Sequence, residues 1–131
     1  MTDRNVVDSS AWLEYLADSD QAAHFAGALE DTDSLIVPVV TIYEVFKKVL
    51  RERGENEALQ VAGQMQCGTV VDLTLSLALD AARHRLPLAD SIIYATALQC
   101  GATLWTRDAD FEGLPNVRYF PKPRKMPDES A

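Results

Sequence analysis

Short, continuously apolar runs alternate along the chain with longer segments in which apolar residues recur at helical spacing. Continuous apolar runs of four to eight residues are typical of strands that are buried on both faces of a sheet. The expected strands are 5–8, 35–37, 69–73, 103–106 and 117–120. Pro38 is expected to stop the second strand, because proline cannot donate a hydrogen bond to the ladder. The pattern predicts a parallel sheet of about five strands.

The clearest helix follows the second strand. Its apolar residues fall at positions i, i+3, i+4, i+7 and i+8, which places them on one stripe: Ile42, Val45, Phe46, Val49 and Leu50. Further helices are expected from Ser9 or Ser10 to about 16, at 20–29, 55–66 and 75–84, and through 92–97 to near Gly101. Strands separated by helices predict an α/β fold of three layers. We expect one domain over residues 1–120 and a loose tail at 121–131, which is rich in proline and charge.

The charge of the chain restricts its function. It carries 20 acidic and 12 basic residues, a net charge of −8, which argues against a protein that coats nucleic acid non-specifically. An enzyme acting on nucleic acid is compatible with an acidic site beside a local basic patch. Basic residues gather in two places: Lys47, Lys48, Arg51 and Arg53, then Lys122, Arg124 and Lys125. A solvated surface is the plainer interpretation of both groups. No signal peptide or membrane-spanning run is visible, so we expect a cytoplasmic protein.

Four acidic residues are expected at one end of the sheet. Asp8 and Asp108 follow the first and fourth strands, Glu44 lies early in the helix after the second, and Asp90 opens the helix before the fourth. Sites in parallel α/β sheets form beyond the carboxyl ends of the strands. Crowded carboxylates repel one another, and a divalent cation removes that penalty. Each acid also has a plain alternative: a helix cap for Asp8 or Asp90, an ion pair with Lys48 for Glu44, and an Asx-turn for Asp108.

Four sequence motifs carry a resemblance to PIN domains, in particular to VapC-type toxins. They occur in the expected order over residues 4–120, and they are Val6–Trp12, Thr41–Val45, Leu86–Ala97 and Leu104–Phe111. The resemblance implies a PIN-like fold and a Mg²⁺-dependent (or Mn²⁺-dependent) endoribonuclease. It implies Asp8, Glu44, Asp90 and Asp108 as catalytic and metal-binding acids. It implies partners as well: an RNA substrate, a cognate antitoxin, and a homodimer or a toxin–antitoxin hetero-oligomer, with no membrane.

Supporting roles also follow from the resemblance. Thr106 is expected to support the site through a hydroxyl hydrogen bond, and Asp110 to assist. Ser9 is a further candidate, although helix capping is its plainer role. RNA is expected to run along Lys47, Lys48 and Arg51, which follow Glu44 on the same helix. An antitoxin helix is expected to deliver an arginine to the carboxylates, with a groove wall formed by Trp12, Tyr15 and Leu16 unless these residues pack in the core.

Two other functions stay open at this point. One is a phosphatase or phosphotransferase with Asp8 as its nucleophile, although Ser10 stands where haloacid-dehalogenase-like enzymes have a second aspartate. The other is a non-catalytic PIN-like binding module, which would have no need for four converging carboxylates. Cleavage of RNA or of small phosphate esters, with and without metal, separates these classes.

Overall fold

A five-stranded sheet forms the centre of the protein. The computed structural model describes residues 3–122. The strands, all parallel, are β1 (Arg4–Val7), β2 (Leu35–Pro38), β3 (Thr69–Val71), β4 (Ala102–Thr106) and β5 (Val117–Tyr119). Their order is β3-β2-β1-β4-β5. The predicted α/β class and parallel sheet are therefore confirmed.

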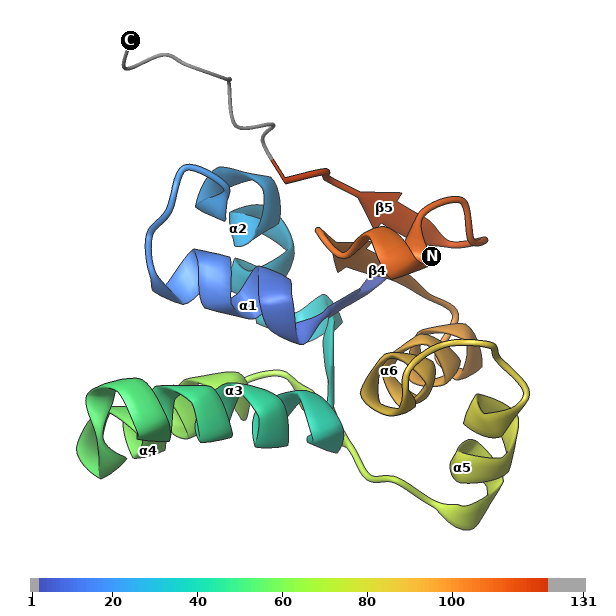
Figure 1. The fold of residues 1–131 in the computed structure, drawn as a ribbon, viewed down its shortest axis with the longest axis horizontal. Coiled ribbons are helices and arrows are strands. Elements are labelled where there is room, and N and C mark those ends of the chain that lie inside the picture. Colours follow the sequence, from blue (N-terminus) through green and yellow to red (C-terminus); the bar gives the residue numbers. More distant parts are fainter. Residues whose placement is uncertain (1–2, 123–131) are drawn as a thin grey trace, which may run out of the picture.

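Helices cover both faces of this sheet (Figure 1). They are α1 (Ser9–Leu16), α2 (Ala22–Glu30), α3 (Val39–Arg53), α4 (Glu55–Met65), α5 (Leu75–Ala82) and α6 (Leu88–Gln99), with short 3₁₀ turns at Thr32–Ser34 and Ala109–Phe111. Successive strand residues point to opposite faces, so Val7 packs with Trp12 and Phe25 while Val6 packs with Ile93 and Leu104. These two cores make the predicted three layers.

Strand β1 lies at the point where the strand order reverses. From β1 the chain builds outward to β2 and β3 on one side and to β4 and β5 on the other. In open α/β sheets a crevice forms at such a point, outside the carboxyl ends of the strands. Asp8 directly follows β1, and it therefore stands at the crevice.

Several expected boundaries differ from the structure. Strand β3 was expected to be buried, but as an edge strand it leaves Thr69 and Val70 exposed. Strand β2 ends at Pro38, as expected, but Pro38 is itself its last residue and pairs with Val71, since its φ of −62° and ψ of 140° are extended. Helix α5 ends at Ala82 rather than near 84. Among the described residues, no helix is long and apolar enough to cross a membrane.

Candidate metal centre

Asp8 is held rigidly at the start of α1. Its side chain is only 3% exposed, and its Oδ1 accepts hydrogen bonds from the Ala11 N–H at 3.0 Å and the Ser10 hydroxyl at 2.9 Å. The other oxygen, Oδ2, accepts a hydrogen bond from the Thr106 hydroxyl at 2.6 Å. Asp8 is thus the N-cap of α1, as its plain alternative predicted, and it also lies at the carboxyl end of β1. The two roles are compatible because the helix begins at the crevice.

Three further acids converge beside Asp8. One carboxylate oxygen each from Asp90, Asp108 and Asp110 lies within 4.8 Å of the others. Asp90 comes from the first turn of α6, whereas Asp108 and Asp110 come from the turn after β4. The Asp110 N–H donates to Asp108 Oδ1 at 2.9 Å, so the Asx-turn expected as the alternative for Asp108 is present within the cluster. Asp110, a weak candidate in the sequence, belongs to the most compact group of acids in the site.

Thr106 joins the two halves of the cluster. This residue is fully buried at the end of β4, and its hydroxyl donates to Asp8 while accepting a hydrogen bond from the Asp108 N–H at 2.9 Å. One side chain therefore fixes both the carboxylate after β1 and the loop after β4. A hydroxyl hydrogen bond was expected of Thr106, and the structure shows one to Asp8; its supporting role in the site stays a prediction.

Glu44 reaches the site from α3 and is positioned by Ser9. Its Oε1 accepts a hydrogen bond from the Ser9 hydroxyl at 2.5 Å. The expected ion pair with Lys48 is absent, because Lys48 pairs instead with Glu52 at 2.7 Å. Ser9 does not cap α1, since Asp8 already does. Glu44 is therefore not paired with Lys48, and Ser9 is not a helix cap. Their side chains form a hydrogen bond with each other instead.

The pKa values show how closely the acids are coupled. Desolvation, and after it the negative charges of Asp108, Asp8, Glu44 and Asp110, together raise the pKa of Asp90 to about 7. Burial also raises the pKa of Asp8, against the hydrogen bonds from Thr106, Ala11 and Ser10, which lower it. The other four acids are therefore all within electrostatic range of Asp90. A proton on Asp90 or a bound cation therefore relieves the repulsion among these carboxylates.

The donor set fits a hard divalent cation. All the available ligand atoms are carboxylate oxygens, which Mg²⁺ and Mn²⁺ prefer over sulfur or imidazole ligands. No histidine or cysteine belongs to a metal-type group in the part of the chain that the structure describes. Asp8, Glu44, Asp90 and Asp108 would supply such ligands, and Asp110 stands close enough to Asp90 and Asp108 to add another.

A comparison with protein families decides the classification. The family model described as PIN domain matches residues 6–116. The chain belongs to the PIN domain family.

Solved structures share the fold of this PIN domain. A toxin–antitoxin complex from Klebsiella pneumoniae matches with a TM-score of 0.75 and 19% identity, covering 90% of this chain and 99% of that one. VapC20 from Mycobacterium tuberculosis, described as a sarcin-ricin loop cleaving toxin, matches with a TM-score of 0.69 and 19% identity over 87% and 98% of the two chains. DNA-bound VapBC from Salmonella typhimurium also scores 0.69, at 16% identity over 92% and 98%. No curated protein sequence matches the chain. At these identities the likeness shows the fold.

The PIN domain contains one link that the sequence analysis missed. Arg107, between Thr106 and Asp108, forms an ion pair with Glu14 on α1, and both side chains are largely shielded from solvent. The pair ties the loop that carries Asp108 to the helix that Asp8 caps. Nothing in the spacing indicates it, because the partners are far apart in sequence and neither lies in an apolar stripe.

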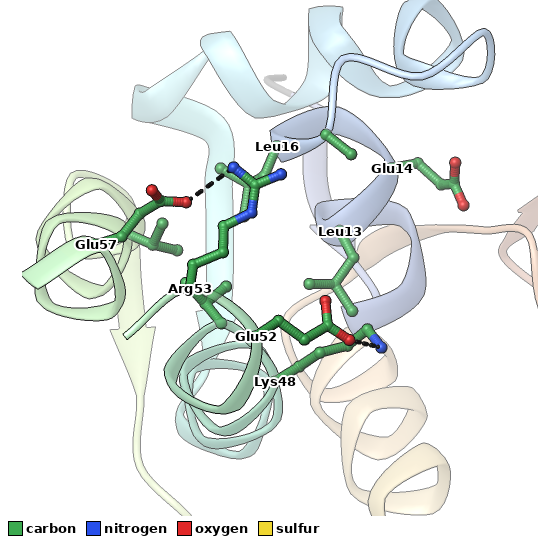
Figure 2. A pocket seen from close by; sticks show the side chains of 10 residues that line it. Leu13, Glu14, Leu16, Lys48, Glu52, Arg53 and Glu57 are labelled. Carbon is green, nitrogen blue, oxygen red and sulfur yellow. Dashed lines mark hydrogen bonds and ion pairs between the residues drawn. The ribbon is translucent and has the colours of Figure 1, made fainter. Parts of the chain in front are cut away.

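A groove opens between α1, α3 and α4 of the PIN domain. It has a volume of about 270 Å³, with a floor of apolar residues and a charged rim. In Figure 2, Leu13 and Leu16 point into it from α1, while Arg53 extends from α3 toward Glu57 of α4, with which it pairs at 3.0 Å. Trp12 does not line this groove, because it is buried in the core with 2% exposure. Of the expected wall residues only Leu16 lines the groove, since Tyr15 packs against the core and donates a hydrogen bond to Glu30; Leu13, which was not predicted, completes the wall on α1.

Proposed function

We propose that this PIN domain is a Mg²⁺-dependent (or Mn²⁺-dependent) endoribonuclease that hydrolyses RNA phosphodiester bonds, and that it is the toxin of a toxin–antitoxin pair. The observation that carries the proposal is the meeting of Asp90, Asp108 and Asp110 within 4.8 Å, with Asp8 and Glu44 beside them. The shared fold with VapC20 and the toxin–antitoxin complexes supports it. We place the activity in the cytoplasm.

The residues of the site have two roles, metal binding and the positioning of the metal ligands. Asp8, Glu44, Asp90 and Asp108 would hold the metal, with Asp110 as a further ligand. A bound Mg²⁺ lowers the pKa of a coordinated water and offsets negative charge on the phosphate and on the leaving oxygen. Hydrogen bonds of Thr106 hold Asp8 and the backbone at Asp108 in fixed positions relative to each other. The Ser9 hydroxyl orients the Glu44 carboxylate in the same way. These hydrogen bonds orient the acids before substrate arrives, and such support is typically worth 10- to 100-fold in metal affinity or activity.

The geometry gives less support to Asp8 as a nucleophile. Both of its oxygens accept hydrogen bonds, and its side chain is 3% exposed, so an attacking lone pair would have to lose one of these partners. A non-catalytic binding module is also a poorer fit. A protein that only bound a partner would gain nothing from a cluster that raises the pKa of Asp90 to about 7.

Incubation with RNA tests the proposed activity. The purified protein should cleave RNA with Mg²⁺ or Mn²⁺ and should leave it intact with EDTA, and mapping of the cut ends would identify the cleaved sequence. A small phosphate ester serves as the parallel substrate. Metal-dependent release of phosphate from the ester, with no RNA cleavage, would favour the phosphatase instead. The absence of both activities would favour the binding module.

The antitoxin is the second part of the proposal. Apolar residues on the floor of the groove and charges on its rim suit an amphipathic helix of a partner. An arginine from that partner could bind two carboxylate oxygens of the metal centre at once and so compete with Mg²⁺. Homodimerisation of the chain stays a prediction, as do the boundary at residue 120 and the tail, of which residues 123–131 lie outside the described part.

A variant of the groove tests the antitoxin. Leu16→Asp places a charge on the apolar floor, so the partner that is purified with the wild type from the native host should dissociate more than about tenfold more readily. RNA cleavage by the isolated variant should persist. The control is Leu59→Asp on α4, where Leu59 is 55% exposed and lines none of the pockets described. The toxin proposal fails if the wild type emerges from its host active, alone and harmless when overproduced.

A further inference from the structure

A small open pocket lies on α3 beside the metal centre. It has a volume of about 190 Å³, and its walls are Tyr43, Glu44, Lys47, Lys48 and Arg51. Glu44 belongs to this pocket and also to the acids that act on Asp90, so the pocket and the metal centre share a wall. Pockets that enclose a drug-sized molecule are typically about 300–1,000 Å³. A smaller and more open pocket suits one segment of a longer polymer.

Tyr43 presents an unusually free aromatic ring to this pocket. It is 59% exposed, whereas Trp12 and Phe111 are at most 2% exposed in the cores. The Lys47 ammonium lies 5.6 Å from the centre of the Tyr43 ring and 3.4 Å from its hydroxyl oxygen. Exposed rings next to cations are the elements with which proteins bind unpaired nucleotides, because every base has a face that can stack.

The charges of the pocket favour a phosphate chain. Lys48 is neutralised by Glu52. Lys47 and Arg51 form no ion pair within residues 3–122, although the whole chain has a net charge of −8. Two cations without carboxylate partners, on an acidic protein and beside an acidic centre, offer a local path for a polyanion. An apolar protein segment would find little complementary surface there besides the Tyr43 ring.

We propose that this pocket binds one nucleotide of an unpaired RNA strand, next to the phosphodiester bond that is cut. Its base stacks on Tyr43, and its phosphate contacts Lys47 and Arg51. The inference rests on the proposed ribonuclease function and adds to it a base-binding residue, Tyr43, and the phosphate contacts beside it. Paired bases are already stacked on their neighbours and cannot occupy the pocket.

Binding of labelled RNA to the full-length protein tests the pocket. In EDTA, where no cleavage is expected, fluorescence anisotropy compares an unpaired oligonucleotide with a duplex of the same composition. Tyr43→Leu should weaken binding of the unpaired strand about tenfold and leave duplex binding unchanged, while Tyr43→Phe stays within about twofold of the wild type. Arg51→Gln should reduce the salt slope by roughly 0.7. The control is Leu59→Ala, an exposed apolar residue outside the pocket.

Cleavage kinetics in Mg²⁺ give a second, independent measurement. Tyr43→Leu should raise KM about tenfold with kcat nearly unchanged, as expected for a residue that binds substrate and transition state equally. If both the affinity and KM stay at wild-type values, the pocket assignment is wrong although the ribonuclease function stands. If Tyr43→Leu instead alters the oligomeric state or the retention of a partner protein, Tyr43 belongs to a protein interface and the inference is overturned. If the wild type neither binds nor cleaves RNA, the proposed function itself fails.

Discussion

Asp90→Asn should reduce Mg²⁺-dependent RNA cleavage by about 10³-fold or more, because the substitution replaces a negatively charged metal ligand in the acidic cluster with a neutral amide. Metal ions supply several kcal/mol of charge stabilisation in the transition state, and each 1.36 kcal/mol corresponds to a factor of ten in rate. Burial and neighbouring charges, but no hydrogen bond, act on the Asp90 carboxylate in the described part of the chain, so asparagine should leave the fold intact. Initial rates on one RNA substrate measure the effect.

Two controls separate catalysis from structure. Asp33→Asn changes an exposed acid in the turn before β2, at the opposite end of the sheet, and should leave the rate unchanged. Asp8→Asn should inactivate the enzyme with little loss of stability, because asparagine is also a good N-cap, whereas Asp8→Ala should lose roughly 1 kcal/mol in addition. Wild-type activity in both Asp90→Asn and Asp8→Asn would show that these acids do not form the metal centre.

Mg²⁺ should raise the melting temperature of the wild-type protein by roughly 10 °C when its concentration is about 100 times the dissociation constant. Binding to the folded state alone contributes about 2.7 kcal/mol at that concentration, and a domain of this size gains several degrees for each kcal/mol. A variant with Asp8, Glu44, Asp90 and Asp108 all converted to amides should lose this shift. Thermal unfolding with and without Mg²⁺ measures it, and an identical shift in the variant would place the ion elsewhere.

The same experiment has a defined pH dependence. The pKa of Asp90 is about 7 in the folded protein and close to 3.8 when unfolded, so between these values the folded state holds a proton that the unfolded state has lost. The metal-free protein should therefore lose stability as pH rises from about 4 to 7. Asp90→Asn should remove part of that loss and melt higher than the wild type at pH 8. The stabilisation by Mg²⁺ should be larger at pH 8 than at pH 5, since protons compete for the same oxygens.

The strands and helices could be predicted from the sequence because the signal of each is local. Buried strands such as Leu35–Pro38 are continuously apolar, and α3 shows one apolar stripe, so each element can be recognised from its own residues. Strand β3 was misjudged because Thr69–Val71 has the same apolar composition as a central strand. Its place at the edge depends on the strand order, which no local pattern contains.

The site could be predicted only as far as its backbone positions. The ends of β1 and β4 and the start of α6 bring Asp8, Asp108 and Asp90 to one crevice whatever their rotamers. Local contacts such as the Asp8 cap could be foreseen, but the contacts that join distant elements through Ser9 and Asp110 could not. Ser9 could cap α1 or contact Glu44, and the choice depended on Asp8 taking the cap. Likewise, the short turn after β4 brings Asp110 back toward Asp90, which its position in the sequence does not indicate.

Asp8 caps α1 and also lies at the crevice. In evolved copies of this protein that have lost their activity, its acidic residues would therefore not all be substituted equally often. Asp90 makes no hydrogen bond among the described residues and lowers the stability of the metal-free fold, so its replacement would be neutral or stabilising. Position 8 would stay restricted to aspartate, asparagine, serine or threonine, which can cap a helix. An inactive copy of this gene should therefore be recognised by a missing acid at position 90 beside an intact capping residue at position 8.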